Sequence, residues 1–187
     1  MKKLFLVFLI VPVMMQAQPG RQSIQWRSIV SAGVISGEAG NDLLLQLSGG
    51  LKIKKFFAGA GAGFDGYRFH SYPLFIDLRF SPGKNQQLFF YGLGGYHFAK
   101  KHDITEEWLK KSDRLKGGFY ADAGLGYFMP AGKRNRFALS AGVTYKYLTQ
   151  IKTFENFCTT GDCGENIFKL RHRLGRLTAK LSWEFGY

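Results

Sequence analysis

Long apolar runs are missing from the sequence after its N-terminal leader. No later stretch has the roughly eighteen consecutive apolar residues that a membrane-spanning helix needs. The mean hydropathy of -0.13 agrees with this absence. Helical membrane spans are therefore excluded beyond the leader, whereas transmembrane β-strands are not, because only alternate residues of such strands face lipid.

The leader, residues 1–17, has the pattern of a secretory signal peptide. It begins with two lysines, continues through an apolar run at 4–13 and ends on the small residue Ala17. The apolar run is too short to span a membrane as a helix. We therefore predict cleavage after Ala17 and a single mature domain, residues 18–187.

Cysteine is scarce, because the chain contains only Cys158 and Cys163, in the polar stretch Cys-Thr-Thr-Gly-Asp-Cys. An exported chain enters an oxidising compartment, so we predict a local disulfide between them. A metal site would need more ligands than this neighbourhood offers, so neither a metal nor another cofactor is predicted.

Acidic residues are also few: 13 Asp and Glu stand against 26 Lys and Arg, which gives a net charge of +13. Such an excess raises nucleic acid as a partner, but an exported protein is not expected to meet it. Outer-membrane lipid is the expected partner instead, in particular the phosphates of lipopolysaccharide.

Apolar and polar residues alternate strictly over residues 177–187 at the end of the chain. A period of two over this length predicts a strand with one apolar and one polar face. Trp183, Phe185 and Tyr187 gather at one end of it, as an interfacial aromatic girdle and a C-terminal insertion signal would. The stretch therefore predicts the final strand of an outer-membrane barrel.

Seven earlier segments alternate in the same way, so we predict an all-β fold, an eight-stranded antiparallel up-and-down transmembrane β-barrel. The strands are expected at 26–34, 43–53, 56–65, 73–80, 87–99, 117–129, 137–147 and in the segment that ends at Tyr187. The fifth strand is apolar on both faces, and we expect Leu88, Phe90, Tyr96 and Phe98 to face outward.

The lengths of the connections agree with a periplasmic N-terminus. Short periplasmic turns are expected at 54–55, 81–86 and 130–136. The first connection, 37–42, is also a turn, whereas the exposed extracellular loops are expected at 66–72, 100–116 and 149–168. The loop at 100–116 has room for a short helix.

Glycine and alanine alternate at 58–63, which raises a phosphate-binding loop as an interpretation. The run lacks the Gly-x-Gly-x-x-Gly spacing, the Lys-Ser/Thr ending and a following helix. We interpret its glycines as one face of a strand that lets the barrel interior close tightly. A soluble lipocalin-type barrel, the rival fold, would need an apolar interior, whereas here the charges share a face with the glycines.

The inward faces of the predicted strands carry four basic and four acidic side chains. The interior of an eight-stranded barrel is filled by side chains, and charges removed from water must be paired or hydrogen-bonded. We therefore predict a salt-bridged lumen, with a proton or ion path through the same groups as the alternative. The predicted network comprises Lys52, Asp65, Asp77, Arg79, Asp122, Lys146, Lys180 and Glu184.

Basic residues gather at the extracellular start of the last strand, at 169–176. The alternation puts Arg171 and Arg173 on the outward face with Leu177. Cations just above an apolar band are well placed for lipopolysaccharide phosphates, which arginine binds bidentately. We predict this contact for Arg171 and Arg173, with an ordinary solvated rim as the alternative.

A lipid A-modifying enzyme is a further alternative. Hydrolysis at the outer rim would need a Ser–His–acid set, for which His70, Ser71 and Glu106 or Glu107 are the candidates. Their spacing does not bring them together on a rigid strand. No catalytic residue is therefore assigned, and the protein is not expected to be an enzyme.

The leader, the alternating strands, the segment Pro-Leu-Phe-Ile-Asp-Leu-Arg-Phe at 73–80 and the ending Trp-Glu-Phe-Gly-Tyr carry a family resemblance. Together they resemble the small outer-membrane β-barrel proteins of the OmpA/OmpX superfamily, including its PorT-like group. The resemblance implies a Gram-negative outer membrane and insertion by the barrel-assembly machinery, which in that family recognises the C-terminal strand. PorT-like relatives are linked to protein secretion, and others to adhesion or envelope integrity.

The expected function is that of a monomeric integral outer-membrane protein with a structural or interaction role. Its extracellular loops would act in envelope integrity, adhesion or surface interaction, with a possible protein partner bound there. The alternative is an accessory component of an outer-membrane secretion or assembly complex, which would be contacted through the loops or the periplasmic turns.

Overall fold

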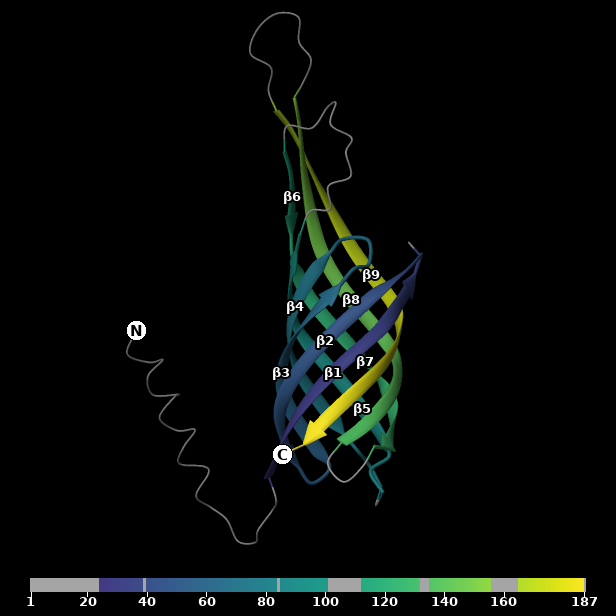
Figure 1. Cartoon of the computed structure of the whole chain (residues 1–187). Helices are drawn as coiled ribbons and strands as arrows, with labels where there is room; N and C mark the ends of the chain where they lie inside the picture. Colours follow the sequence, from purple (N-terminus) through teal and green to yellow (C-terminus); the bar gives the residue numbers. More distant parts are fainter. Residues whose placement is uncertain are drawn as a thin grey trace, which may run out of the picture.

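A computed structural model describes residues 24–38, 40–83, 85–100, 112–131, 135–155 and 165–186. These residues form nine antiparallel strands, eight of which close into a barrel (Figure 1). None of the described residues belongs to a helix long and apolar enough to cross a membrane. The predicted signal peptide lies outside the described residues.

The barrel strands follow one another around the ring in the order β1-β2-β3-β4-β5-β7-β8-β9, and β9 returns to β1. The predicted fold, an eight-stranded antiparallel barrel, is confirmed. The strands are β1 (Ile24–Gly37), β2 (Gly40–Ile53), β3 (Phe56–Asp65), β4 (Ser71–Phe80), β5 (Leu88–Ala99), β6 (Ser112–Lys116), β7 (Gly118–Pro130), β8 (Asn135–Glu155) and β9 (Glu165–Gly186).

The last strand closes the barrel against the first one, as predicted. The ladder between β1 and β9 runs from Ser36 opposite Leu177 to Arg27 opposite Gly186. On its inward face, the hydroxyl groups of Ser31 and Ser182 are 2.7 Å apart. The free edges of β1 and β9 are therefore paired with each other, and the ring has no open edge along this ladder.

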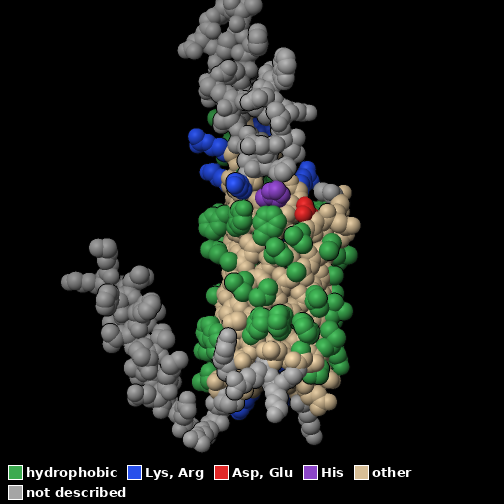
Figure 2. Space-filling model, viewed as in Figure 1, with side chains coloured by type: hydrophobic (Ala, Val, Ile, Leu, Met, Phe, Trp, Pro, Cys, Tyr) green, Lys and Arg blue, Asp and Glu red, His purple; other side chains and the backbone are tan. Residues whose placement is uncertain are grey.

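A belt of exposed apolar side chains covers the outer surface, and every barrel strand contributes to it (Figure 2). Leu47 of β2 is 58 % exposed, Ile76 of β4 60 % and Leu177 of β9 66 %. The predicted orientation of the fifth strand, β5, is confirmed. Its outward residues are Leu88, Phe90, Tyr96 and Phe98, which are 43–55 % exposed.

All three predicted extracellular loops are partly strand. The predicted loop 149–168 is wrong at both ends, because β8 continues to Glu155 and β9 begins at Glu165, with the two paired throughout. Above the belt both strand faces meet water, so the alternation that marks a membrane strand is not needed there. The predicted cysteine pair, Cys158 and Cys163, lies outside the described residues.

The predicted loop 100–116 is also wrong in its last part, because Ser112–Lys116 forms the short strand β6. This strand pairs with the upper part of β8, from Thr153 to Thr149. Its mixed polar sequence, Ser-Asp-Arg-Leu-Lys, has no apolar face that marks it as a strand. Residues 101–111, which have room for a short helix, lie outside the described residues.

Two boundaries near the outer rim differ from the predictions. The strand β4 begins at Ser71, so Pro73 lies within the strand and not at its start. Because proline has no N–H to donate, the ladder to β3 is interrupted between the pairs Asp65–Ser71 and Ala62–Leu74. The predicted turn at 37–42 is shorter, since β1 ends at Gly37 and β2 begins at Gly40.

The depth of the belt predicts how the barrel tolerates charge on its lipid face. Replacing Leu47, in the middle of β2, with arginine should lower the free energy of unfolding by about 2–4 kcal/mol. The same change at Ile53, at the end of the strand, should cost only about 0–1 kcal/mol. Urea titration of the protein folded in phospholipid vesicles measures both values, and equal costs would contradict this placement of the belt.

Candidate functional site

Buried charges occupy the barrel interior at three depths. An outer layer is centred on Asp65, a middle layer on Asp122 and Asp77, and an inner layer on Glu184. All four carboxylates are at most 3 % exposed. Charges at such positions need partners within the protein, and each layer supplies them in a different way.

The outer layer joins one carboxylate to two cations. Oδ2 of Asp65 lies 2.7 Å from Nη1 of Arg176 and 3.2 Å from Nζ of Lys146. Lys146 also donates a hydrogen bond of 3.1 Å to Oγ of Ser71. All three charged side chains are fully buried, so removing any one of them would leave a charge with too few partners.

The connection between β3 and β4, residues 66–70, folds over this layer and forms an outer lid. Nζ of Lys146 donates hydrogen bonds to the backbone carbonyls of Tyr67, at 3.2 Å, and Phe69, at 3.1 Å. The ring of Tyr67 is 3 % exposed and packs against Ile35. The ammonium group of Lys146 in the lumen thus binds the backbone of the outer lid.

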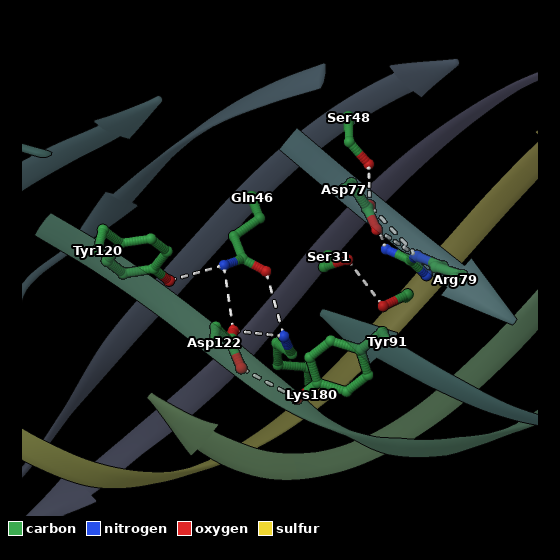
Figure 3. A network of polar contacts seen from close by, with 10 residues as sticks. Ser31, Gln46, Ser48, Asp77, Arg79, Tyr91, Tyr120, Asp122 and Lys180 are labelled. Carbon is green, nitrogen blue, oxygen red and sulfur yellow. Dashed lines mark hydrogen bonds and ion pairs between the residues drawn. The ribbon is translucent and has the colours of Figure 1, made fainter. Parts of the chain in front are cut away.

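The middle layer crosses the lumen from wall to wall (Figure 3). Nζ of Lys180 on β9 lies 2.7 Å from Oδ2 of Asp122 on β7. The hydroxyl group of Tyr91 on β5 donates to the other carboxylate oxygen at 3.1 Å. The amide of Gln46 on β2 donates to the hydroxyl group of Tyr120 on β7 at 3.0 Å. This bond brings β2 into the network as its fourth strand.

A second pair in the middle layer lies within one strand. Asp77 and Arg79 share the inward face of β4 because they are two residues apart, and Nη2 of Arg79 lies 2.8 Å from Oδ2 of Asp77. Ser48 donates a hydrogen bond of 2.8 Å to the same oxygen. The guanidinium of Arg79 also lies 5.6 Å from the ring centroid of Phe89, within the range of a cation–π contact.

The inner layer, at the predicted periplasmic end, where β9 ends, has two arginines beside one carboxylate. Glu184 forms an ion pair with Arg136, and Nε of Arg27 lies 3.6 Å from Oε1 of Glu184. The guanidinium of Arg136 lies 3.9 Å from the ring centroid of Phe128. Lys52 is half-buried on β2. Cations therefore outnumber carboxylates at this mouth among the described residues.

Glycine makes room for the aromatic side chains that fill the space between these layers. A Cβ atom on Gly124 would lie 2.8 Å from the hydroxyl group of Tyr91, which is too close. Phe89 and Phe128 stack with their ring centroids 4.2 Å apart. Aromatic rings thus fill the interior where glycines on neighbouring strands leave space for them. This agrees with the expected role of the glycine-bearing strand faces.

The structure places all eight side chains of the predicted lumen network on the inward faces of the barrel. Its members meet in the pairs Asp65–Lys146, Asp77–Arg79 and Asp122–Lys180, whereas Glu184 pairs outside the predicted set. Sequence reasoning missed Arg27, Arg136 and Arg176. Arg176 was placed in the basic rim, although its even position shares the inward face with Lys180.

The two arginines predicted to contact lipopolysaccharide are exposed on the outward face of β9. His172 lies between Arg171 and Arg173 on the opposite face, where its Nε2 is 3.2 Å from Oε1 of Gln150. Burial, together with the cations Arg68 and Lys152, lowers the pKa of His172. The basic charge of this strand on its outward face is supplied by Lys169 and the two arginines.

The described part of the predicted girdle, Trp183 and Phe185, forms a cluster at the end of β9. The ring centroids of Trp183 and Phe185 are 4.4 Å apart, and Phe137 lies 5.7 Å from Trp183. Tyr187 lies outside the described residues. Recognition of this strand end by the barrel-assembly machinery stays a prediction.

Of the residues considered for hydrolysis, the structure describes Ser71 and His70, and it gives each of them other contacts. Ser71 is the first residue of β4 and not a loop residue, and its fully buried hydroxyl group accepts a hydrogen bond from Lys146. The ring of His70 lies 5.5 Å from that of Phe64 instead. Glu106 and Glu107 lie outside the described residues, within which no His, Cys, Asp and Glu side chains gather as metal ligands would.

No protein-family model and no curated protein matches the sequence. Among solved structures, the outer membrane protein OprG from Pseudomonas aeruginosa is similar, with a TM-score of 0.53 and 14 % identity, over 88 % of this chain and 94 % of that one. The N-terminal β-barrel domain of P. aeruginosa OprF also matches, with a TM-score of 0.47, 15 % identity and coverage of 86 % and 97 %. The likeness to OprG shows the fold, that of an outer-membrane β-barrel.

The middle layer predicts a strong coupling between two charges. Lys180→Met leaves the carboxylate of Asp122 buried without its cation and should lower the free energy of unfolding by about 3–5 kcal/mol. The double variant K180M/D122L removes both charges and should recover most of this loss. Urea titration in vesicles gives the values for K180M, D122L and the double variant, and additive losses would refute the coupling.

Proposed function

We propose that the protein is an integral outer-membrane barrel that binds partners at the cell surface through a sheet above its outer rim. The apolar belt supports its placement in the membrane, since such a surface is stable only in lipid. The side-chain-filled interior leaves the two ends as surfaces for contacts. The observation that carries the proposal is the extension of β8 and β9 beyond the ring (Figure 1).

This surface sheet consists of β6 and the paired upper parts of β8 and β9. On its other side, β9 pairs with β1 only as far as Leu177. Within the described residues, the stretch 169–175 therefore has a backbone edge that no further strand covers. Such an edge can accept an extended segment of another protein as an added strand.

The side chains along this edge indicate what kind of segment fits. Lys169, Arg171 and Arg173 are exposed on one face, and Leu170 is 41 % exposed on the other. Opposite charges on neighbouring strands stabilise a pair, whereas like charges oppose it. The basic edge thus disfavours a second copy of itself and favours an extended segment with acidic side chains at alternate positions.

Such a surface is compatible with a role in envelope integrity, in adhesion or in a secretion complex. These roles differ in the partner and not in the residues that would bind it. The basic residues above the belt (Figure 2) support a role at the outer leaflet. The resemblance to the PorT-like group makes a secretion or assembly complex the second candidate.

The proposed contact can be tested in intact cells by photo-cross-linking. A cross-linking residue at position 169 should give a protein adduct of discrete mass, because the edge is exposed to partners there. The charge-reversing change Arg173→Glu should reduce that adduct. A cross-linking residue at Leu139, which is 58 % exposed on the lipid face, serves as the control. Lipid adducts alone at both positions would refute the surface contact.

We also propose that Arg171 and Arg173 bind lipopolysaccharide phosphates. Both are exposed on the face that carries Leu177, at the upper edge of the belt. Guanidinium groups there can form bidentate contacts with phosphate oxygens without leaving the lipid interface.

The lipopolysaccharide contact predicts a change in what the protein retains on purification. The variant R171E/R173E should retain several-fold less lipopolysaccharide than the unmodified protein, since each change replaces attraction by repulsion. The variant R114E/K116E makes the same charge change on β6 and should retain the normal amount. Equal retention by all three proteins, measured by phosphate analysis, would contradict the assignment.

A further inference from the structure

The periplasmic end of the barrel has a basic rim that the lumen network does not use. Its described part is the connection between β2 and β3, where Lys54 and Lys55 are both exposed. In the sequence, the other two connections at this end, 81–87 and 131–134, add three basic residues and no acidic one. The rim is therefore positive at all three connections.

The acidic side chains near this end are already occupied. Within four residues of the strand ends at this edge, the described structure has two carboxylates, those of Asp77 and Glu184. Asp77 is paired with Arg79 at 2.8 Å, and Glu184 forms its ion pair with Arg136. Among the described residues, the exposed lysines have no carboxylate left at this end, so an external anion would have to balance them.

The turn that carries the two lysines is a tight two-residue connection. The φ of Lys54, 53°, lies in the left-handed region, which such hairpin loops require and which glycine and asparagine adopt at lower cost than other residues. The turn therefore keeps a long cationic side chain at a position where its geometry favours a different residue.

Aromatic side chains next to the lysines fix their depth in the membrane. Phe56 follows Lys55 directly, is 62 % exposed on the lipid face and stacks on Phe80 with ring centroids 4.8 Å apart. The backbone N–H of Ser81 donates a hydrogen bond of 2.8 Å to the carbonyl oxygen of Lys55, which ties the two turns together. Exposed aromatic pairs of this kind mark the membrane–water interface, so the two ammonium groups lie at the level of the headgroups.

We propose that Lys54 and Lys55 bind the anionic headgroups of phospholipids in the periplasmic leaflet. A lysine near an anionic membrane surface strengthens binding roughly fivefold. A soluble acidic partner would meet the same charges but would gain nothing from the adjacent lipid-facing rings. The position of the lysines beside Phe56 and Phe80 therefore favours lipid. The proposal is independent of the surface sheet at the opposite end.

The test uses the full chain, folded in zwitterionic micelles and titrated with phosphatidylglycerol or phosphatidylcholine. Native mass spectrometry counts the bound lipids. The proteins compared carry R171E/R173E, which removes the phosphate contacts proposed for the outer rim. In this background the protein with both lysines should prefer phosphatidylglycerol, and adding K54Q/K55Q should weaken that binding on the order of twentyfold. K54R/K55R keeps both charges and should keep the preference.

A matched control removes the same charge at the other end of the barrel. Lys100 and Lys116 are exposed near the outer rim, and adding K100Q/K116Q to the same background should leave the binding of phosphatidylglycerol unchanged. Heat-modifiable gel mobility verifies that every variant is folded. The proposal is overturned if the R171E/R173E protein with both lysines shows no preference for phosphatidylglycerol, or if adding K54Q/K55Q leaves that preference intact.

Discussion

In a hydrocarbon environment every backbone N–H and C=O group must find a partner within the protein. The ladder between β1 and β9 meets this demand, because without it two strand edges would face lipid. Closure after eight strands also limits the radius, and a barrel of this size is filled by its own side chains. Whatever the strands bring inward must therefore be satisfied inside, and contacts with other molecules are left to the outer surface and the two ends.

The barrel interior contains more basic side chains than acidic ones, so some of its cations need partners other than carboxylates. Six basic side chains share four carboxylates in the ion pairs of the described barrel interior. Aromatic rings take up part of the difference: the ammonium of Lys180 lies 4.0 Å from the ring centroid of Tyr91, and Arg136 lies over Phe128. Lys146 uses backbone carbonyls of the outer lid in addition to Asp65. The filled lumen thus combines ion pairs, ring faces and main-chain acceptors.

The membrane part of the fold could be predicted from the sequence because lipid imposes an apolar outward face with a period of two. The bounds of β3 follow from that alternation alone, whereas β5 is apolar on both faces, so the alternation does not determine its orientation. Above the belt water solvates both faces, so β6 and the upper half of β8 have no such signal. Partners such as Asp122 and Lys180 depend on radius and register, which a single sequence does not specify. Arg136 was taken for a turn residue because it stands at the very start of β8.

The strand β9 has two hydrogen-bonded neighbours in its lower part and one in its upper part. The part that would bind a partner is therefore distinct from the part that closes the barrel. From Leu177 to Phe185, β9 pairs with both β1 and β8, whereas above Leu177 it pairs with β8 alone. Segments with fewer hydrogen-bonded neighbours open locally at lower free energy than the rest of a structure. Arg176, buried against Asp65 at 2.7 Å, stands at the boundary between the two parts. A partner that binds the surface sheet can therefore change the upper part of β9 while the ion pair and the double ladder below it keep the barrel closed.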